Sequence, residues 1–123
     1  LAPYWAEAHA NMGSAYNVSG DQDKALEHYG SALAINPNLP QTLLNAGAIH
    51  LKRGNLDQAE QFFRGLLEIV PNSAQAYNAL GLTYARRRET AAAVAAFRRA
   101  IQINPEFADA QRNLKTLTEG KAP

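Results

Sequence analysis

The chain has 123 residues, of which 46% are apolar and 19% are charged, and its formal net charge is +1. This composition predicts one folded domain and excludes an intrinsically disordered chain. The absence of cysteine excludes disulfides and thiolate metal sites, and no run approaches the roughly 18 apolar residues of a membrane helix. The start of the chain lacks a signal-peptide pattern. No compartment is indicated, and the cytoplasm is the default expectation.

Helical periodicity begins in the first third of the chain, where apolar residues recur at spacings of three and four. A first helix is expected at about 6–19 and a second at about 22–35. Between them, Gly20 supplies the positive φ that ends a helix, and Asp21 is the predicted N-cap of the next one. The inward face of the first helix is expected to carry Ala8, Met12, Ala15 and Tyr16.

The middle third shows the same signals with two substitutions in the expected core. Pro40 suits a first helical turn, and Gly54 with Asn55 predicts another turn and N-cap. Ala46 is smaller than the residues 34 positions before and after it, whereas Leu66 is larger than the residues 34 positions before and after it. We interpret this pair as a compensation of core volume.

The last third departs at its turn, where Arg88 replaces the expected glycine. Either the turn is reshaped, or Arg88 accepts a left-handed conformation that costs roughly 1 kcal/mol. Residues 108–118 predict a short helix that covers the end of the preceding unit. The resulting fold class is all-α.

The chain is self-similar at a spacing of 34 residues. Four positions recur: Gly13, Gly47 and Gly81; Ala25, Ala59 and Ala93; Tyr29, Phe63 and Phe97; and Pro3, Pro37, Pro71 and Pro105. This period and pattern resemble the tetratricopeptide repeat (TPR) family. The resemblance implies a right-handed α-solenoid of antiparallel helix pairs, whose concave groove is lined by the first helix of each pair.

The expected organisation is a single TPR domain over 1–123. Repeats are predicted at 6–39, 40–73 and 74–107, with a capping helix at 108–118, since a solenoid needs a terminal element that covers its last repeat. The chain starts without Met, and Pro3 stands at a closing-proline position. We therefore expect a fragment of a longer protein.

Asparagine recurs at one position that faces the groove in the family, at Asn11, Asn45 and Asn113, whereas the third repeat has Ala79 there and Asn78 beside it. An amide both donates and accepts, so it can hold a peptide group of an extended ligand. This series resembles the asparagine ladder of the O-linked N-acetylglucosamine transferase superhelix, which holds peptides by their backbones. The alternative is that these amides bond neighbouring helices.

The resemblance also assigns the rest of the groove, an apolar middle with a basic end. Its predicted lining is Leu44, Ala48, Leu51, Lys52, Leu82 and Arg86. TPR domains that clamp acidic chaperone tails carry Lys, Asn and Arg at five positions, which here read Ala10, Ser14, Asn45, Gln75 and Ala79. Only Asn45 matches, so we do not expect chaperone-tail binding.

Other chemistry is not expected. His9 and His50 occupy packing positions, and His28 has no second histidine near it in sequence, so no metal site and no cofactor are predicted. Residues 84–123 carry a charge of +4 against −3 for 1–83, but aromatic residues between the arginines are sparse, which argues against nucleic acid. A solvated helix face explains the basic end better than steering of an acidic partner. No catalytic motif occurs, and we expect no enzyme activity.

The expected function is a non-catalytic scaffold that binds an extended peptide or helix of a partner protein in its groove. One alternative is the substrate-recruiting arm of a larger enzyme, such as a glycosyltransferase. Another is a structural module whose ends, with Trp5 and Phe107, associate end to end.

Overall fold

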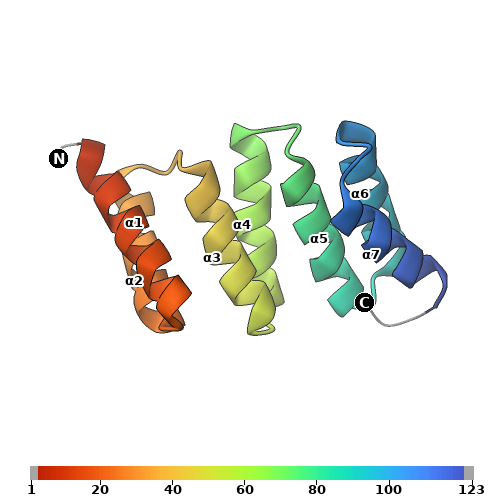
Figure 1. Cartoon of the computed structure of the whole chain (residues 1–123), viewed down its shortest axis with the longest axis horizontal. Coiled ribbons are helices and arrows are strands. Elements are labelled where there is room, and N and C mark those ends of the chain that lie inside the picture. The colour runs from red at the N-terminus through yellow and green to blue at the C-terminus, as the bar shows by residue number, and fades with distance from the viewer. Residues whose placement is uncertain (1–2, 121–123) are drawn as a thin grey trace.

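The computed structural model describes residues 3–120, and every regular element in that range is a helix. The helices are α1 (Pro3–Ser19), α2 (Gln22–Ile35), α3 (Pro40–Lys52), α4 (Leu56–Ile69), α5 (Ala74–Arg86), α6 (Thr90–Ile103) and α7 (Ala108–Thr118). The helix pairs follow one another along the long axis of the molecule, with α1 and α2 at one end and α6 and α7 at the other (Figure 1). The predicted all-α solenoid is confirmed.

The helices pack as successive hairpins. α1 packs on α2, α3 on α4 and α5 on α6, while α2 meets α3, α4 meets α5, and α7 covers both α5 and α6. The odd-numbered helices form one layer, in which α3 contacts α5 and α5 contacts α7. We call the surface of α1, α3, α5 and α7 the odd-helix face and that of α2, α4 and α6 the even-helix face.

Local side-chain bonds set the start of two helices. Asp21 accepts a hydrogen bond from the backbone N of Lys24 at 3.1 Å, so the predicted cap of α2 is confirmed. Ser73 caps α5 in the same way through the N of Ala76. Asn55 precedes α4, but its side chain makes no capping bond. Its amide lies 3.3 Å from a ring nitrogen of His50 instead. Asn55 therefore stands at the predicted N-cap position, but without the capping bond expected of its side chain.

The three turns within the hairpins have one geometry despite the change of residue. Gly20 and Gly54 have φ of 94° and 81°, and Arg88 has φ of 64°. The N–H of Glu89 bonds the carbonyl of Tyr84 at 2.9 Å, as the N–H of Asp21 bonds Tyr16. The turn is therefore not reshaped, and Arg88 adopts the left-handed conformation.

A glycine and a large ring meet inside each hairpin. The rings of Tyr29, Phe63 and Phe97 are almost completely buried. A Cβ added to Gly81 would lie 2.5 Å from Phe97, and the matching glycines of the other hairpins meet their rings as closely. The paired helices approach this closely because these positions carry no side chain.

The inward face predicted for α1 was wrong in part. Met12 is 45% exposed, and Ala8 and Ala15 are also exposed, whereas Tyr16 is half-buried. The same positions in α3 are buried, at 5% exposure for Thr42 and 1% for Ala46. The preceding hairpin covers α3, but no described element lies on the outer side of α1.

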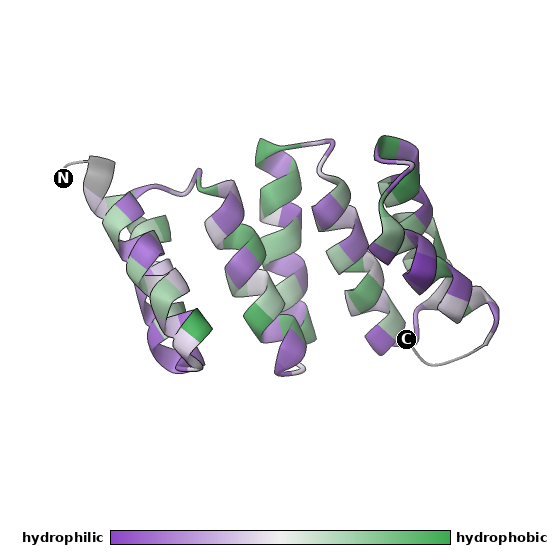
Figure 2. Cartoon of the chain, in the orientation of Figure 1, coloured by the Kyte–Doolittle hydropathy of each residue, from purple (hydrophilic) through white to green (hydrophobic). Residues whose placement is uncertain are grey.

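Figure 2 shows hydrophilic and hydrophobic residues mixed on the helices of the row. Along residues 3–120, no helix combines the length and apolar character that crossing a bilayer requires.

Candidate functional site

The predicted asparagines all lie on odd-numbered helices. Asn11 is on α1, Asn45 on α3, Asn78 on α5 and Asn113 on α7, and all but the exposed Asn11 are half-buried. The 34-residue spacing therefore puts one amide on each helix of the odd layer.

Two of these amides meet directly. Nδ2 of Asn113 donates a hydrogen bond of 3.1 Å to Oδ1 of Asn78, across the contact between α5 and α7. An Asn side chain has two donor hydrogens and two acceptor lone pairs. Each partner therefore keeps a donor and an acceptor beyond this bond.

Asn45 is held by a buried tyrosine. Its Nδ2 donates to the hydroxyl of Tyr29 at 3.4 Å, and its Oδ1 accepts from Gln41 at 2.9 Å. The Tyr29 hydroxyl also lies 3.2 Å from that of Ser14, and the tyrosine is 1% exposed. Because Tyr29 cannot move freely in the core, these bonds fix the orientation of the Asn45 amide.

Part of the predicted apolar lining of the groove packs into the core. Leu44 and Leu51 are half-buried and pack against the cluster around Phe63. Leu82 is half-buried, while Ala48 and Lys52 are exposed. This part of the odd-helix face therefore offers leucine edges beside an exposed cation.

The basic end contains one cation that is used within the fold. Nη1 of Arg86 donates to the backbone carbonyl of Leu51 at the end of α3. A cation at a helix C-terminus is favoured by the helix dipole. Arg86 therefore ties α5 to the preceding hairpin.

A recurring ion pair links consecutive hairpins, and the sequence reasoning missed it. Arg53 bonds Asp23 at 2.7 Å, and 34 residues later Arg87 bonds Asp57. The signal was present as an Asp followed 30 residues later by an Arg in two successive units. These arginines join a helix of one hairpin to the next hairpin.

The junction between the second and third hairpins has an additional carboxylate, Glu60. It bonds Arg87 from the next hairpin and Arg64 one turn along α4. These bonds, first that from Arg87, hold the pKa of Glu60 below its usual value although burial opposes the shift. The hydroxyl of Tyr84 joins the network, receiving a bond from Arg64 at 2.5 Å. Burial raises the pKa of Tyr84.

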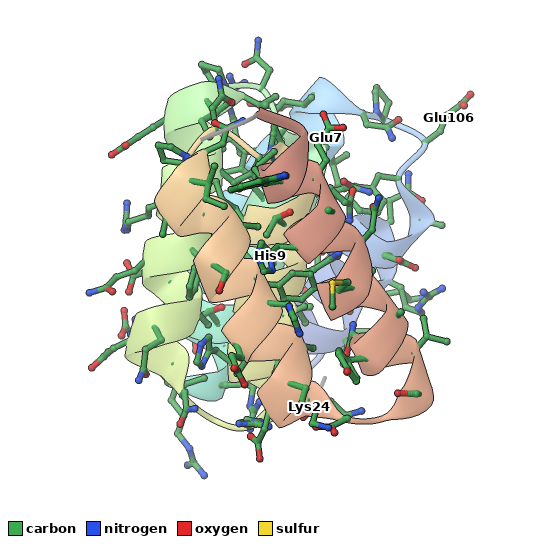
Figure 3. All side chains as sticks on the ribbon, turned by 90° about the vertical axis from the view of Figure 1, so that its left-hand side faces the viewer. Glu7, His9, Lys24 and Glu106 are labelled. Carbon is green, nitrogen blue, oxygen red and sulfur yellow. The ribbon has the colours of Figure 1, made fainter. Side chains whose placement is uncertain are left out.

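The histidines stack with other rings. His28 lies between His9 and Tyr16, with ring centroids 5.4 Å from each, and Nδ1 of His9 is 3.1 Å from Nδ1 of His28. Figure 3 shows His9 at the α1 end of the row. His50 stacks on Phe62, and burial followed by the charge of Arg53 lowers its pKa. Across the described residues, no group of three or more His, Asp or Glu side chains is arranged to hold a metal.

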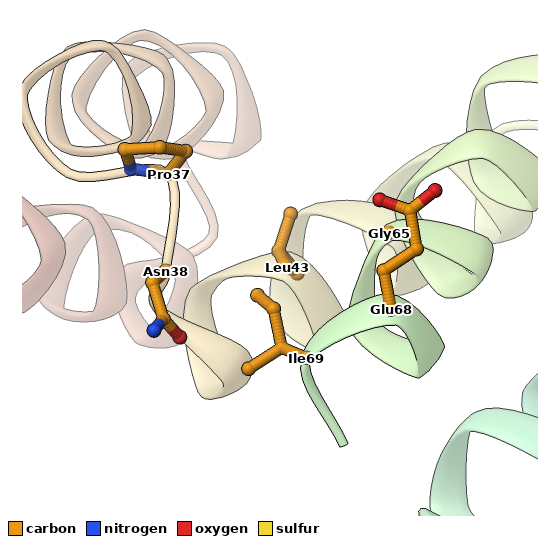
Figure 4. A pocket seen from close by; sticks show the side chains of 6 residues that line it. All are labelled: Pro37, Asn38, Leu43, Gly65, Glu68 and Ile69. Atoms are coloured by element: carbon orange, nitrogen blue, oxygen red, sulfur yellow. The ribbon is translucent and has the colours of Figure 1, made fainter. Parts of the chain in front are cut away.

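Two hollows lie beside the loop between α2 and α3. The larger has a volume of about 590 Å³, and Figure 4 shows Leu43 and Ile69 at its apolar part with Glu68 and Asn38 around them. The second, of about 300 Å³, is lined in part by Leu33 and Phe62. None of the four asparagines of the odd helices lines either hollow.

These features define a helical-repeat solenoid with amides repeated along one layer. A family model described as tetratricopeptide repeat matches residues 19–82, and a second with the same description matches 74–107. The chain belongs to the tetratricopeptide repeat family. Such domains generally act as non-catalytic interaction modules.

Solved structures share this fold. The Arabidopsis OM64 TPR domain has a TM-score of 0.91 at 24% identity, over 96% of this chain and 98% of that one. The first TPR of Spaghetti (RPAP3), bound to the HSP90 peptide SRMEEVD, has a TM-score of 0.91 at 17% identity, over 98% and 95% of the two chains. MamA has a TM-score of 0.80 at 30% identity, over 88% of this chain and 63% of that one. A search of curated proteins gives no significant sequence match.

Proposed function

We propose that this chain is a non-catalytic protein-interaction scaffold that holds an extended peptide or helix of a partner protein along its odd-helix face. The observation that carries the proposal is the placement of Asn11, Asn45, Asn78 and Asn113 on successive odd helices. Each amide that bonds within the fold keeps unused hydrogen-bonding capacity. A row of such amides suits a ligand that is held by its main chain.

Preorganisation favours Asn45 as the central contact. Its bonds to Tyr29 and Gln41 leave one amide hydrogen and one oxygen lone pair, which match the carbonyl and N–H of a peptide group. An amide that is already oriented loses little conformational entropy when the ligand binds. The Asn78–Asn113 pair offers the same groups one helix further along.

The chemistry of this face favours an internal peptide segment over a terminal carboxylate. The positions that hold an acidic chaperone tail in clamp-type TPR domains read Ala10, Ser14, Gln75 and Ala79 beside Asn45, and none is a cation. Ser14 already bonds Tyr29. The HSP90 peptide bound by Spaghetti is therefore not the expected ligand type here.

The test is a random-peptide display screen on this chain, repeated on Asn45→Ala/Asn78→Ala and at two salt concentrations. A shared motif that the double variant loses supports the proposal. Gln58→Ala removes an exposed amide of α4, on the other layer, and is the matched control. Binding that survives in the double variant, or no selected motif at all, contradicts it. Retention at high salt assigns affinity to the leucine edges, because screening weakens only the charged contacts.

A second candidate, self-association, is favoured by the outer side of α1. Trp5 and Met12 are 46% and 45% exposed there, next to the exposed Ala8 and Ala15. The exposed residues of α7 at the other end include Gln111 and Arg112, so two α1 ends suit each other better than opposite ends do. Sedimentation velocity should then show a dimer that Met12→Lys disrupts. A monomer at high concentration contradicts this candidate.

A further inference from the structure

A ring pair recurs between the two helices of a hairpin. Tyr16 stacks on His28 with centroids 5.4 Å apart, and 34 residues later His50 stacks on Phe62 with centroids 5.5 Å apart. Another step of 34 residues leads to Tyr84 and Ala96. The third hairpin therefore keeps one ring of the pair and lacks the other.

The missing ring leaves a position with aromatic residues on two sides. In the first hairpin, His28 is sandwiched between Tyr16 and His9, at 5.4 Å from each. The counterparts of these two flanking residues in α5 are Tyr84 and Tyr77. They are seven residues apart, or about 10 Å along the helix. That separation matches the room that one ring occupies between its two neighbours in the first hairpin.

A hollow of about 350 Å³ exists at this position. We call it the ring slot. It is lined by Arg64, Leu67, Tyr77, Leu80, Tyr84, Ala92, Ala95 and Ala96. Leu80 replaces the smaller Ala46 of the preceding hairpin and takes up part of the space. The remaining volume is within the roughly 300–1,000 Å³ of ligand pockets.

Charged groups at the slot favour an acidic neighbour for the ring. Arg99 lies over the Tyr77 ring, 5.8 Å from its centroid, and bonds the neutral side-chain oxygens of Asn72 and Gln102. Within residues 3–120, no carboxylate is at ion-pair distance from Arg99. Arg64, by contrast, is already paired with Glu60. Arg99 is therefore the cation at this edge whose charge is not balanced.

We propose that the ring slot binds an aromatic side chain of a partner protein, with an acidic residue next to that side chain pairing with Arg99. The ring enters where His28 and Phe62 stand in the first two hairpins and packs between Tyr77 and Tyr84. Stacking and burial supply affinity, and the ion pair selects the sequence context. The slot is lined by residues of α4, α5 and α6, and none of the four asparagines of the odd helices belongs to its lining.

The test uses three blocked dipeptides and NMR. Acetyl-Phe-Asp-amide is expected to shift the methyl resonances of Ala92, Ala95 and Ala96, because a stacked ring shields nearby methyl groups. Acetyl-Leu-Asp-amide and acetyl-Phe-Lys-amide are expected to bind roughly threefold to tenfold more weakly. Equal shifts from the Phe and Leu probes would overturn the aromatic assignment, and unmoved methyl groups would overturn the site itself.

Plugging the slot provides the matched comparison. Ala96→Phe places a ring at the position of Phe62, and Ala95→Phe fills the slot from an exposed position should the first variant be strained against Leu80. Either folded variant is expected to lose binding of acetyl-Phe-Asp-amide. Ala91→Phe adds the same ring at an exposed position of α6 outside the lining, and it should bind as the parent does. Undiminished binding by a plugged variant would refute the proposal.

A charge test separates the second part of the proposal. Arg99→Gln removes the cation and is expected to abolish the preference for Asp over Lys beside Phe while the methyl shifts persist. An unchanged preference would refute the role of Arg99 and leave an aromatic site without a charge requirement.

Discussion

Replacing Gly81 by Ala should destabilise the fold, although the same change usually stabilises a helix. Gly81 lies inside α5, where Ala is favoured by up to about 1 kcal/mol. The new Cβ would lie 2.5 Å from two atoms of the Phe97 ring, whereas carbon atoms pack best at about 3.5–4.0 Å. The ring is completely buried and must move by about 1 Å to relieve the contact.

The magnitude follows from these two opposing effects. Overpacking a core costs about 1–3 kcal/mol. Subtracting a helix gain of about 1 kcal/mol leaves a net loss in the free energy of unfolding of up to about 2 kcal/mol. The matched control is Gly30→Ala in α2, where an added Cβ meets no atom within 4 Å. It should stabilise by about 1 kcal/mol or less.

Chemical denaturation of both variants, followed by circular dichroism, gives the comparison. Phe97→Leu removes Cε1 and Cζ, two of the three ring atoms nearest the added Cβ, so a double-mutant cycle should show Gly81→Ala to be less harmful in that background. The reasoning is refuted if Gly81→Ala stabilises as Gly30→Ala does, or if the cycle shows no coupling with Phe97.

Three further outcomes follow from the junctions and turns. Arg87→Ala should lower the free energy of unfolding by about 1–3 kcal/mol, because it leaves the mostly buried Glu60 without its main partner. Arg53→Ala should lower it by less than about 1 kcal/mol, since Asp23 is 87% exposed. Urea unfolding of both variants tests this order, and a larger loss for Arg53→Ala contradicts it. The lowered pKa of Glu60 contributes stability that is complete above the unfolded-state pKa of about 4.3 and is lost as pH falls through the folded-state pKa. Glu60→Gln should therefore reduce the fall in the free energy of unfolding at acid pH. An unchanged fall would assign it to other groups. Arg88→Gly should raise the free energy of unfolding by about 0.5–1 kcal/mol by removing left-handed strain, and a lower thermal midpoint would show that Arg88 is not strained.

The fold was predictable because the residues that begin and end its helices act locally. Gly20, Asp21 and Pro40 specify helix ends through φ, a capping oxygen and a missing N–H, and each acts within a few residues. Helix α2 spans the predicted 22–35 for this reason. The exposure of Met12 was not predictable from the spacing of apolar residues in its helix, because burial there depends on whether another hairpin lies outside α1.

Packing partners between hairpins were also beyond the sequence reasoning. Ala46 and Leu66 were interpreted as compensating each other, but they belong to different core clusters. The ring of Phe62 packs against both of these clusters. The period locates equivalent positions but not which neighbours meet.

The candidate site was predictable only in outline. The period places the asparagines on one layer, but it does not show that Asn78 bonds Asn113 or that Tyr29 holds Asn45. The basic end was interpreted as solvated, yet Arg86 and Arg87 bond across hairpins. Such contacts depend on the angle between neighbouring hairpins, which no local pattern encodes.

The two junctions between hairpins differ in their ion pairs, so the solenoid should not be equally stiff along its length. Among residues 3–120, the junction between the first two hairpins has one ion pair, Arg53–Asp23, at a solvent-exposed edge. The junction between the second and third hairpins has Arg87 bound to both Asp57 and Glu60, with Arg64 and Tyr84 in the same network. Bending should therefore concentrate between α2 and α3, where less ionic bonding resists it. Under a pulling force, or when a ligand spans the odd-helix face, the α1–α2 hairpin would rotate or detach first while the remaining helices stay as one block.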